Sequence, residues 1–517
     1  MISIAANLGA DGLWTVSPLV RWPLTTTYLA IIALIAIYGL HRYWLVFLFY
    51  RRRRNVRRTL RHFDPLPSVT VQLPMYNEGN VAERIIDAAC RLDYPADRLQ
   101  IQVLDDSTDG SDAITRRSVE GWQQRGVDIQ LLHRDHRTGF KAGALAEAIG
   151  TARGTFVAIF DADFVPPPNF LLRTIHHFTD ARVGMVQARW AHMNRDDSLL
   201  TRCQAIFLDG HFIIEHTARN RAGRWINFNG TAGVWRRETI LDAGSWQHDT
   251  LTEDVDLSYR AQLAGWDFVF LPRVRCPAEL PPEINAFKAQ QHRWTKGSIQ
   301  TARKLLPRLL KAPIPLRVKI EAFFHLTSPM VYLYVSLMAL LFYPAISVNA
   351  LVVKRGNMVG LLLGMSLFAV GAASASVFYL ASQGTQRRSL LATALKLPAL
   401  MSIGIGIALN NARGCLEALT GHQSSFERTP KYNTTNPEVR ARGVIPTPST
   451  KAWMSLIEVG MGLYTLLCAH LVMNTPSTVI SLPFLLLFSL GYLYVGIGGL
   501  ISQWSSRRKT APAVVLP

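Results

Sequence analysis

The sequence predicts an α/β domain with a parallel sheet, joined to an α-helical membrane region. Short β-branched runs alternate with helical runs between about residues 66 and 300, a pattern typical of parallel sheets. Apolar runs long enough to cross a membrane lie on both sides of this region. Charged residues make up 18% of the chain and hydrophobic residues 49%, a balance that favours membrane segments combined with a folded polar domain.

The first 50 residues contain a long apolar run, "YLAIIALIAIYGL" extended by "YWLVFLFY". The run lacks a charged n-region and an A-x-A cleavage site, so residues 1–50 are expected to hold a retained transmembrane helix rather than a signal peptide. Arginines crowd the following segment, 51–65. Because basic residues beside a span stay in the cytoplasm, we expect the N-terminus outside, residue 51 onward inside, and anionic lipid headgroups against this cluster.

Within residues 66–300, local patterns predict four strands and two helices. β-branched or alternating runs that end at Pro or Asp predict strands at 68–74, 99–106, 128–133 and 155–163. Helical runs are expected at 80–92 and 141–152. Polar residues gather just past the carboxyl ends of the strands, where open α/β sheets bind ligands, so the functional site is expected at that edge.

The chain from residue 323 to 517 predicts a second membrane region, after an amphipathic interfacial helix at 301–322. Four runs there are long enough to span, at 323–346, 358–381, 453–472 and 479–501. Basic residues in the loop 410–452 place it in the cytoplasm, so an even number of crossings must precede it. We therefore expect five spans in the chain and an interfacial or re-entrant helix at 388–412, with six spans as the alternative.

Charge and composition narrow the classes of function. A net charge of +19 suits nucleic acid, anionic lipid or phosphate-bearing ligands. The basic residues cluster beside a span without interleaved aromatic residues, which disfavours nucleic acid. The five cysteines include no C-x-x-C pair, which indicates reduced thiols rather than a zinc site or disulfide framework. Neither a P-loop nor a G-x-G-x-x-G after a strand occurs, which argues against an ATPase or a dinucleotide enzyme.

The motif "FDADF" ends the most apolar strand with Asp161 and Asp163. Side chains at i and i+2 leave an extended strand on the same side. Two carboxylates so placed can bind Mg²⁺ or Mn²⁺ together with the phosphates of a substrate. The alternative, a pair of solvated loop acids, leaves the surrounding apolar residues unexplained.

A second acidic group, "LTEDVDL", holds Glu253, Asp254 and Asp256. A carboxylate here can accept a proton, since an aspartate with an ordinary pKa of about 3.9 is ionised at neutral pH. Asp256 is better explained as the cap of the helix that begins at "VDLSYRAQLAG".

The motif "VLDDSTDGS" places Asp105 and Asp106 where a strand meets a loop. Their carboxylates can accept hydrogen bonds from a base N–H or from ribose hydroxyls. A helix cap followed by a turn explains the same residues equally well.

Two basic motifs suit a diphosphate. In "HRTGFKAGAL", Lys141 lies beside the start of a helix, although an ordinary amphipathic helix start has the same pattern. In "QQHRW", Gln290, Arg293 and Trp294 are spaced i, i+3, i+4 and so share one helix face. Arginine offers a fork for phosphate and tryptophan a flat apolar plate for a sugar; a structural Trp–Arg packing pair is the alternative.

Taken together and in this order, the motifs resemble those of the processive family 2 glycosyltransferases of the cellulose synthase superfamily. The residues that carry the resemblance are "LPMYNE", "VLDDSTD", "FKAGAL", "FDADF", "NGTAGVWRR", "TEDVDL" and "QQHRW". Within the superfamily, the sequences of four motifs are most similar to the branch that includes glucomannan (β-mannan) synthases: "VLDDSTD", "VQARW", "FNGTAGVWR" and "QQHRW". The segment "FERTPKY" (426–432) is similar in position and composition to the gating loop of cellulose synthases, but its sequence differs from the usual sequence of that loop.

The resemblance implies a GT-A (Rossmann-like) fold and inverting transfer of a hexose from a nucleotide diphosphate sugar to a growing β-linked polysaccharide. GDP-mannose fits the branch and UDP-glucose fits the wider superfamily. By motif, Tyr76, Asp105 and Asp106 would hold the nucleoside, and Lys141 would contact the diphosphate.

The same resemblance assigns the remaining roles. Asp161 and Asp163 would bind the sugar nucleotide and Mg²⁺ or Mn²⁺, and Asp254 would be the general base. Three residues would hold the diphosphate and the end of the acceptor: Gln290, Arg293 and Trp294.

The expected protein is a multi-pass enzyme of the plasma membrane, the inner membrane of a bacterium, with its catalytic domain in the cytoplasm. Its expected partners are the donor, the polysaccharide acceptor and membrane lipids, without nucleic acid; the sequence identifies no accessory subunit. The spans could form an export channel or only an anchor. Two alternatives remain: non-processive transfer to a membrane lipid, and a transporter with a regulatory nucleotide-binding domain. Few ionisable residues in the spans disfavour the transporter.

Overall fold

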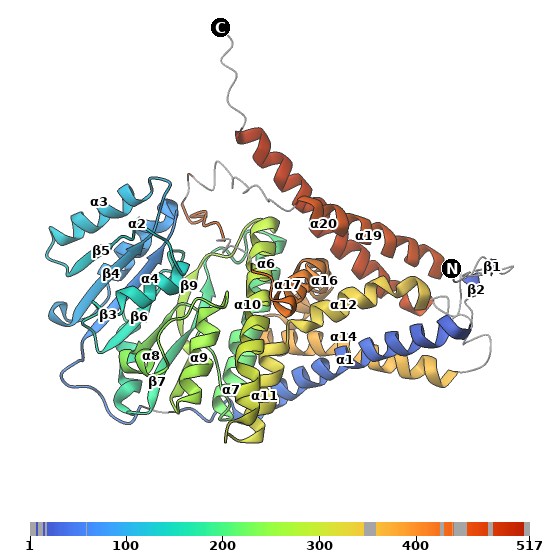
Figure 1. Ribbon diagram of the computed structural model, residues 1–517, viewed down its shortest axis with the longest axis horizontal. Helices are drawn as coiled ribbons and strands as arrows, with labels where there is room; N and C mark the ends of the chain where they lie inside the picture. The colour runs from blue at the N-terminus through green and yellow to red at the C-terminus, as the bar shows by residue number, and fades with distance from the viewer. Residues whose placement is uncertain are drawn as a thin grey trace, which may run out of the picture.

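The computed structural model describes residues 7–8, 14–15, 18–57, 59–345, 358–423, 429–436, 438, 452–473 and 479–510. Figure 1 shows a sheet with its covering helices on the left and a group of long helices on the right. A two-stranded antiparallel pair, β1 (Asn7–Leu8) and β2 (Trp14–Thr15), lies near the N-terminus.

A seven-stranded sheet forms the centre of the α/β domain, in the order β5-β4-β3-β6-β8-β7-β9. Its strands are β3 (Val69–Met75), β4 (Leu99–Asp105), β5 (Ile129–Leu132), β6 (Phe156–Ile159), β7 (Val183–His192), β8 (Gly233–Arg236) and β9 (Asp267–Ala278). Strands β3 to β6 run parallel, as predicted. Strand β8 is antiparallel to both of its neighbours, β6 and β7, so the complete sheet is mixed rather than parallel.

Strands β3 and β4 are buried along their whole length because helices cover both faces of the sheet. Val71 and Leu73 pack with Ile85 of α2 on one face. On the other face the sequence places polar residues, and these form a buried ladder: Gln72 Nε2 donates to Gln102 Oε1 at 3.0 Å. The alternation in "LQIQVLDD" therefore does not mark one buried and one solvent-exposed face. Both faces of the strand are buried, one packed through apolar side chains and the other through hydrogen bonds.

The helices of this domain connect the strands and cover the sheet. They are α2 (Gly79–Cys90), α3 (Asp112–Gln123), α4 (Phe140–Ala148), α5 (Phe170–Thr174), α6 (Leu199–Asp209), α7 (Thr217–Arg221), α8 (Arg237–Asp242), α9 (Glu253–Leu263) and α10 (Ile284–Lys311). Short 3₁₀ turns are η1 (Ala96–Arg98) and η2 (Ile175–Thr179), and η3 (Gly210–His216) is a π-helix between α6 and α7. The boundary predicted between residues 300 and 301 falls inside α10.

Helices, several of them long and apolar, make up the second region. They are α1 (Pro18–Arg52), α11 (Leu316–Thr327), α12 (Met330–Leu340), α14 (Met358–Thr385), α15 (Leu390–Ala394), α16 (Leu397–Gly406), α17 (Ala408–Thr420), α19 (Ala452–Met473) and α20 (Leu482–Thr510), with the 3₁₀ turn η4 (Val479–Ser481) before α20. In the described residues, four helical stretches are long and apolar enough to cross a membrane, and a fifth is added if α11 and α12, which bend by 54°, form one span.

The segment 388–412, predicted to be an interfacial or re-entrant helix, belongs to a helical stretch that is long and apolar enough to cross a membrane. Helices α15 to α17 together, Leu390–Thr420, meet the length and composition of a span. Helix α17 also extends into the predicted loop 410–452. Several basic residues used to orient that loop lie outside the described residues: Arg428, Arg440, Arg442 and Lys451. The choice between five and six spans stays a prediction.

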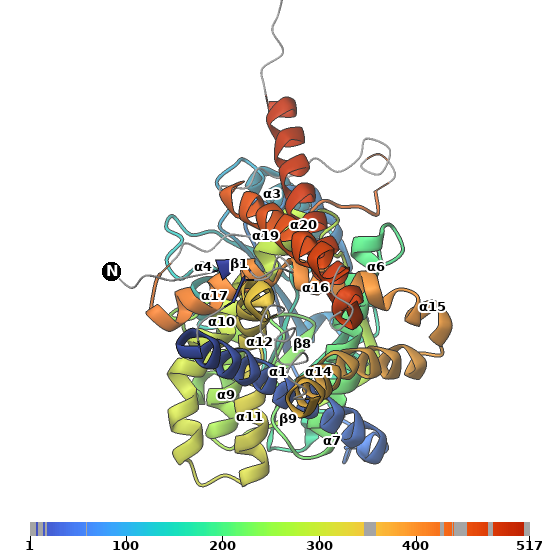
Figure 2. The ribbon, with the colours of Figure 1, turned by 90° about the vertical axis from the view of Figure 1, so that its right-hand side faces the viewer.

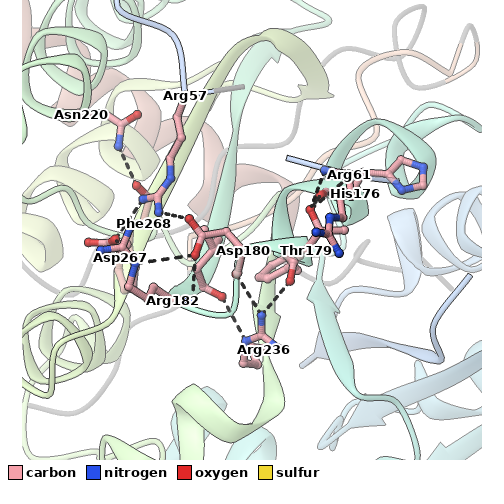
Figure 3. A network of polar contacts seen from close by, with 12 residues as sticks. Arg57, Arg61, His176, Thr179, Asp180, Arg182, Asn220, Arg236, Asp267 and Phe268 are labelled. Carbon is pink, nitrogen blue, oxygen red and sulfur yellow. Dashed lines mark hydrogen bonds and ion pairs between the residues drawn. The ribbon is translucent and has the colours of Figure 1, made fainter. Parts of the chain in front are cut away.

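The segment after α1 is fixed to the edge of the α/β domain (Figure 3). Arg57 donates to Asp267 Oδ2 at 3.1 Å and also forms an ion pair with Asp180. The backbone N–H of Arg61 donates to Thr179 Oγ1 at 3.4 Å. Arg57 thus joins the first long helix to the α/β domain. Lipid contact by this segment stays a prediction for the exposed residues Arg51–Arg54.

Candidate active site

Two adjoining pockets lie at the carboxyl ends of β3, β4 and β6. The outer pocket, about 90 Å³, is lined by Tyr76 and Asp106 among others. The inner pocket, about 70 Å³, contains both acidic motifs. The two pockets share four lining residues, which makes them one cleft: Lys141, Asp161, Arg293 and Lys431.

The cleft brings together every predicted site residue except Asp105. Asp105 is 1% exposed and lines neither pocket. One of its carboxylate oxygens, Oδ1, accepts hydrogen bonds from the backbone N–H, at 2.9 Å, and the hydroxyl of Ser107, which fixes the turn after β4. Its contact with a nucleoside stays a prediction.

The outer pocket has a flat aromatic and cationic side. The Arg137 guanidinium lies 3.3 Å from the centre of the Tyr76 ring. Asp106 forms an ion pair with Arg134, whose Nε donates to Oδ1 at 2.9 Å. Arg134 also donates to the carbonyl of Phe140 at 3.0 Å, so this pair holds the start of α4 against β4 and thereby positions Lys141.

Each acid of "FDADF" contacts a lysine ammonium. Lys141 Nζ lies 2.6 Å from Asp161 Oδ1, and Lys431 Nζ lies 2.6 Å from Asp163 Oδ1. Strand β6 ends at Ile159, so the two acids lie in the turn beyond it and not on an extended strand as predicted. Both nevertheless line the inner pocket.

The donor set of this pocket fits a hard divalent cation. Asp161 and Asp163 offer carboxylate oxygens, the ligands that Mg²⁺ and Mn²⁺ prefer. Among the described residues, no three His, Cys, Asp or Glu side chains form a metal-binding group. A cation here would therefore complete its coordination with substrate oxygens or water, as Mg²⁺ commonly does.

Lys141 is the central cation of the cleft. Besides Asp161, its Nζ reaches the carbonyl oxygen of Gly230 at 2.9 Å and Glu253 Oε1 at 4.0 Å. Burial alone would lower the pKa of Lys141, but the carboxylates of Asp161 and Glu253 outweigh burial and raise the pKa above its ordinary value. The ammonium therefore stays charged at neutral pH.

Asp254 lies in the first turn of α9, next to Glu253. Burial and the neighbouring charge of Glu253 raise the pKa of Asp254 to about 7, against the opposing effects of Lys141, the Val255 N–H and Arg293. The ordinary value of about 3.9 expected from the sequence is therefore wrong for this group. A carboxylate with a pKa near neutrality is well matched to the work of a general base.

Asp256 does not cap α9, because the helix begins at Glu253 and its N-cap is Thr252. The carboxylate of Asp256 is 0% exposed and forms ion pairs with Arg260, at 2.8 Å, and Lys304, at 2.9 Å. Its role is structural, as favoured from the sequence, but through ion pairs within and between helices.

The face of α10 predicted from "QQHRW" is formed. Gln290, Arg293 and Trp294 all line the inner pocket. The Trp294 ring lies 6.3 Å from that of Trp190 on β7, centroid to centroid. Together the two rings give the pocket an apolar part of its wall.

Lys431 is a site residue that sequence reasoning did not single out. It belongs to the described part of "FERTPKY", whose residues 426–428 lie outside the described residues. The segment around it is attached to the α/β domain: Arg84 contacts both Glu279 and Asn433, the latter at 3.0 Å, and the Thr434 N–H donates to Glu279 at 3.2 Å. The spacing along the chain gives no local signal for such a contact.

A cavity of about 500 Å³, here called the long cavity, continues from the inner pocket into the long helices. Asp254, Gln290 and Trp294 line both. Farther in, apolar residues of α1, α12, α14, α16 and α20 form most of its wall, among them Tyr332 and Ala372. The charged residues Arg42, Glu215 and Arg219 also line it. The cleft therefore opens toward the membrane region at Asp254.

Comparison with known proteins agrees with this arrangement. Residues 67–297 match the family described as "Glycosyltransferase like family 2". Over 251 residues the chain is 44% identical to "Probable glucomannan 4-beta-mannosyltransferase 6" of Oryza sativa subsp. japonica, a match that covers 48% of this chain and 44% of the relative. The chain thus spans less than half the length of that relative.

Solved structures give weaker matches. The mannosyltransferase PcManGT from Pyrobaculum calidifontis, solved with GDP-Man and Mn²⁺, is 22% identical, with a TM-score of 0.49, over 68% of this chain and 97% of that one. TarS of S. aureus is 14% identical, with a TM-score of 0.36, over 61% of this chain and 55% of that one.

The family match and the sheet agree on the same segment of the chain. It begins just before β3 and ends within α10, and so includes all seven strands of the sheet and both acidic motifs. Residues 67–297 therefore form a glycosyltransferase family 2 domain with a GT-A-like fold.

Proposed function

We propose that the protein is a membrane-bound inverting hexosyltransferase, which moves a hexose from a nucleotide diphosphate sugar to a growing β-linked polysaccharide. One observation carries this proposal: Asp254 lies where the pocket that holds Lys141 and Arg293 meets the long cavity. A donor bound in the pocket and an acceptor held in the cavity would meet at this carboxylate.

The outer pocket suits the nucleoside and diphosphate of the donor. The Tyr76 ring and the Arg137 guanidinium present flat surfaces for a base, and Asp106 offers hydrogen-bond acceptors for ribose or base. Lys141 and Arg293, which line both pockets, would face the diphosphate. Asp105 is proposed to support the nucleoside from behind, through the turn it fixes.

Asp161 and Asp163 would hold Mg²⁺ or Mn²⁺ against the donor. A bound cation would supply charge neutralisation for the departing diphosphate. A cation held by Asp163 would compete with the Lys431 ammonium, which lies 2.6 Å from Asp163 Oδ1. Lys431 then becomes available to the diphosphate itself.

Asp254 acts as the base. It accepts the proton of the acceptor hydroxyl while that oxygen forms a bond to the anomeric carbon and the bond from this carbon to the diphosphate breaks. The electron pair leaves with the diphosphate, and Lys141 and Arg293 stabilise the charge that develops. Attack from the side opposite the leaving group inverts the anomeric centre.

Trp294 and Gln290 are proposed to hold the end of the acceptor. Both line the inner pocket and the long cavity, so a sugar placed on the Trp294 ring has its next residues in the cavity. The long cavity then receives the polymer and leads it between the long helices. Transfer is in this way coupled to export across the plasma membrane, with the catalytic domain in the cytoplasm.

The relative named above is a glucomannan 4-beta-mannosyltransferase, which favours GDP-mannose over UDP-glucose as the donor. The test uses the purified full-length protein with each labelled donor, with and without Mg²⁺ or Mn²⁺, followed by digestion with linkage-specific glycanases. We expect a metal-dependent polymer that β-mannanase degrades. A lipid-extractable product of one or two sugars would instead show transfer to a membrane lipid, and no transfer at all would leave the transporter alternative.

A further inference from the structure

Four arginines gather outside the cleft, where β7 and β9 meet the end of α14. Arg189 on β7 and Arg275 on β9 are register partners in the sheet. Like charges directly opposite each other destabilise a sheet. All four arginines are described residues, and none of them lines the inner pocket, the outer pocket or the long cavity: Arg189, Arg195, Arg275 and Arg388.

Arg189 is the least compensated of the four. It is 7% exposed, and its Nε has no hydrogen-bond partner among the described residues. Its Nη2 donates one long hydrogen bond, 3.5 Å, to Gln386 Oε1. Burial lowers the pKa of the Arg189 guanidinium, and Arg275, Arg195 and Arg388 lower it further, against the opposing effect of Asp209.

Carboxylates do not balance the cluster. Arg195 forms an ion pair with Asp209 at 2.6 Å, and within the described part of the chain this is the only ion pair that any of the four arginines makes. Asp196 is nearby but exposed, and it pairs with Arg202 at 3.4 Å. The four arginines thus have one buried carboxylate, Asp209, as an ion-pair partner within the described residues, which leaves an excess of positive charge.

The cluster lies at the end of the apolar helix α14. Gln383, in the last turns of α14, accepts from Arg195 at 2.9 Å, and the Arg388 N–H donates to the Gln383 carbonyl at 3.1 Å. Helix α15 follows and projects from the side of the molecule (Figure 2). Its flank exposes large apolar side chains: Leu390 at 54%, Leu391 at 72% and Leu395 at 74%.

We propose that Arg189, Arg195, Arg275 and Arg388 bind the phosphate group of an anionic phospholipid. The acyl chains of this lipid would lie against the exposed leucines of α15. Guanidinium forks bind phosphate oxygens in pairs, and basic pockets at the cytoplasmic ends of membrane helices suit lipid headgroups. The phosphate would relieve the repulsion between Arg189 and Arg275 and join the β7–β9 edge to α14. This proposal does not depend on the transferase function.

The test measures the thermal unfolding of the purified full-length protein in uncharged detergent, with phosphatidylglycerol, with phosphatidylcholine, or with inorganic phosphate added. Variants Arg275→Gln and Arg388→Gln remove exposed members of the site with little risk to the fold. Arg387→Gln is the matched control, since Arg387 is also exposed and basic and is adjacent in sequence. Native mass spectrometry of the same samples counts retained lipids.

We expect phosphatidylglycerol, and not phosphatidylcholine, to raise the unfolding temperature of the unmodified protein. Arg275→Gln and Arg388→Gln should lose most of that shift and one retained lipid, and Arg387→Gln should keep both. An equal loss in Arg387→Gln would mean non-specific surface charge and overturn the site. The same stabilisation by inorganic phosphate alone would overturn the lipid as its source, and no response to phosphatidylglycerol would overturn the proposal as a whole.

Discussion

The inner pocket and the long cavity share a wall but have different linings. The inner pocket measures about 70 Å³ and is dominated by carboxylates and their cationic partners. The long cavity measures about 500 Å³ and is lined mainly by apolar residues, many of them from the long helices, with a few charged residues such as Glu215 and Arg219. The two meet at Asp254, Gln290 and Trp294. The proposed chemistry of transfer and the proposed passage of the product therefore use largely different residues, which can be changed separately.

The largest effect is expected at the shared residue. Asp254→Asn removes the proton acceptor but keeps the shape of the side chain, so turnover should fall by about 10²–10⁴-fold. Donor binding, measured by calorimetry with GDP-mannose, should persist because Lys141 and Arg293 are unchanged. The matched control is Asp249→Asn, which alters an exposed carboxylate paired with Lys304 at 2.7 Å outside both cavities. Near-normal synthesis by the Asp254 variant would contradict the assignment of the base.

A change confined to the inner pocket should alter the response to metal. Asp163→Ala removes one of two proposed ligands and leaves the ammonium of Lys431 without its partner. The metal concentration for half-maximal donor binding should rise about tenfold or more, which corresponds to ~1.4 kcal/mol. Donor binding measured at increasing concentrations of Mn²⁺ gives this midpoint.

The converse variant tests the competition between lysine and metal. Lys431→Met removes the ammonium that contacts Asp163, so the midpoint of the same titration should move to a lower metal concentration. If Asp163→Ala leaves the titration unchanged, the proposed metal site is wrong. If Lys431→Met raises the midpoint, Lys431 assists cation binding and does not compete with it.

The sequence predicted the half of the sheet where local patterns are strong. Strands β3, β4, β5 and β6 have continuous or alternating β-branched residues, and the structure confirms them. The other half was not singled out. Strand β9 contains Pro272, Arg273 and Arg275, and the register of β7 with β9 shifts at Arg189, so neither strand has a clean period of two. Their place in the sheet depends on tertiary pairing with the rest of the domain.

The candidate site shows the same limit. Residues in compact motifs, such as Asp161 and Arg293, were predicted to meet and do line one pocket. Lys431 was not predicted, because its contact with Asp163 joins two distant parts of the chain. The raised pKa of Asp254 was also missed, since it arises from burial and from Glu253 and not from residue type.

The pH dependence of transfer should follow the ionisation of Asp254, the proposed base, which lines both the inner pocket and the long cavity. Asp254 can accept a proton only when ionised, and its pKa of about 7 means that it is increasingly protonated as the pH falls below neutrality. Initial rates at saturating donor should therefore be highest above pH 7 and fall about tenfold per pH unit well below it. A rate that stays constant as the pH is lowered from about 8 to about 5.5 would contradict this role.

The smallest effect on chemistry is expected from a change confined to the long cavity. Ala372 on α14 lines it, and the adjacent Ala373 is exposed on the outside of the same helix. Ala372→Trp should narrow the passage, so elongation should slow several-fold and the product should shorten, as measured by size-exclusion chromatography of labelled polymer. Donor binding and the metal titration should not change. Ala373→Trp adds the same side chain to the same helix but toward the lipid, and it should preserve product length. If Ala372→Trp makes polymer of normal length at the normal rate, the polymer does not pass through this cavity and the long helices serve as an anchor.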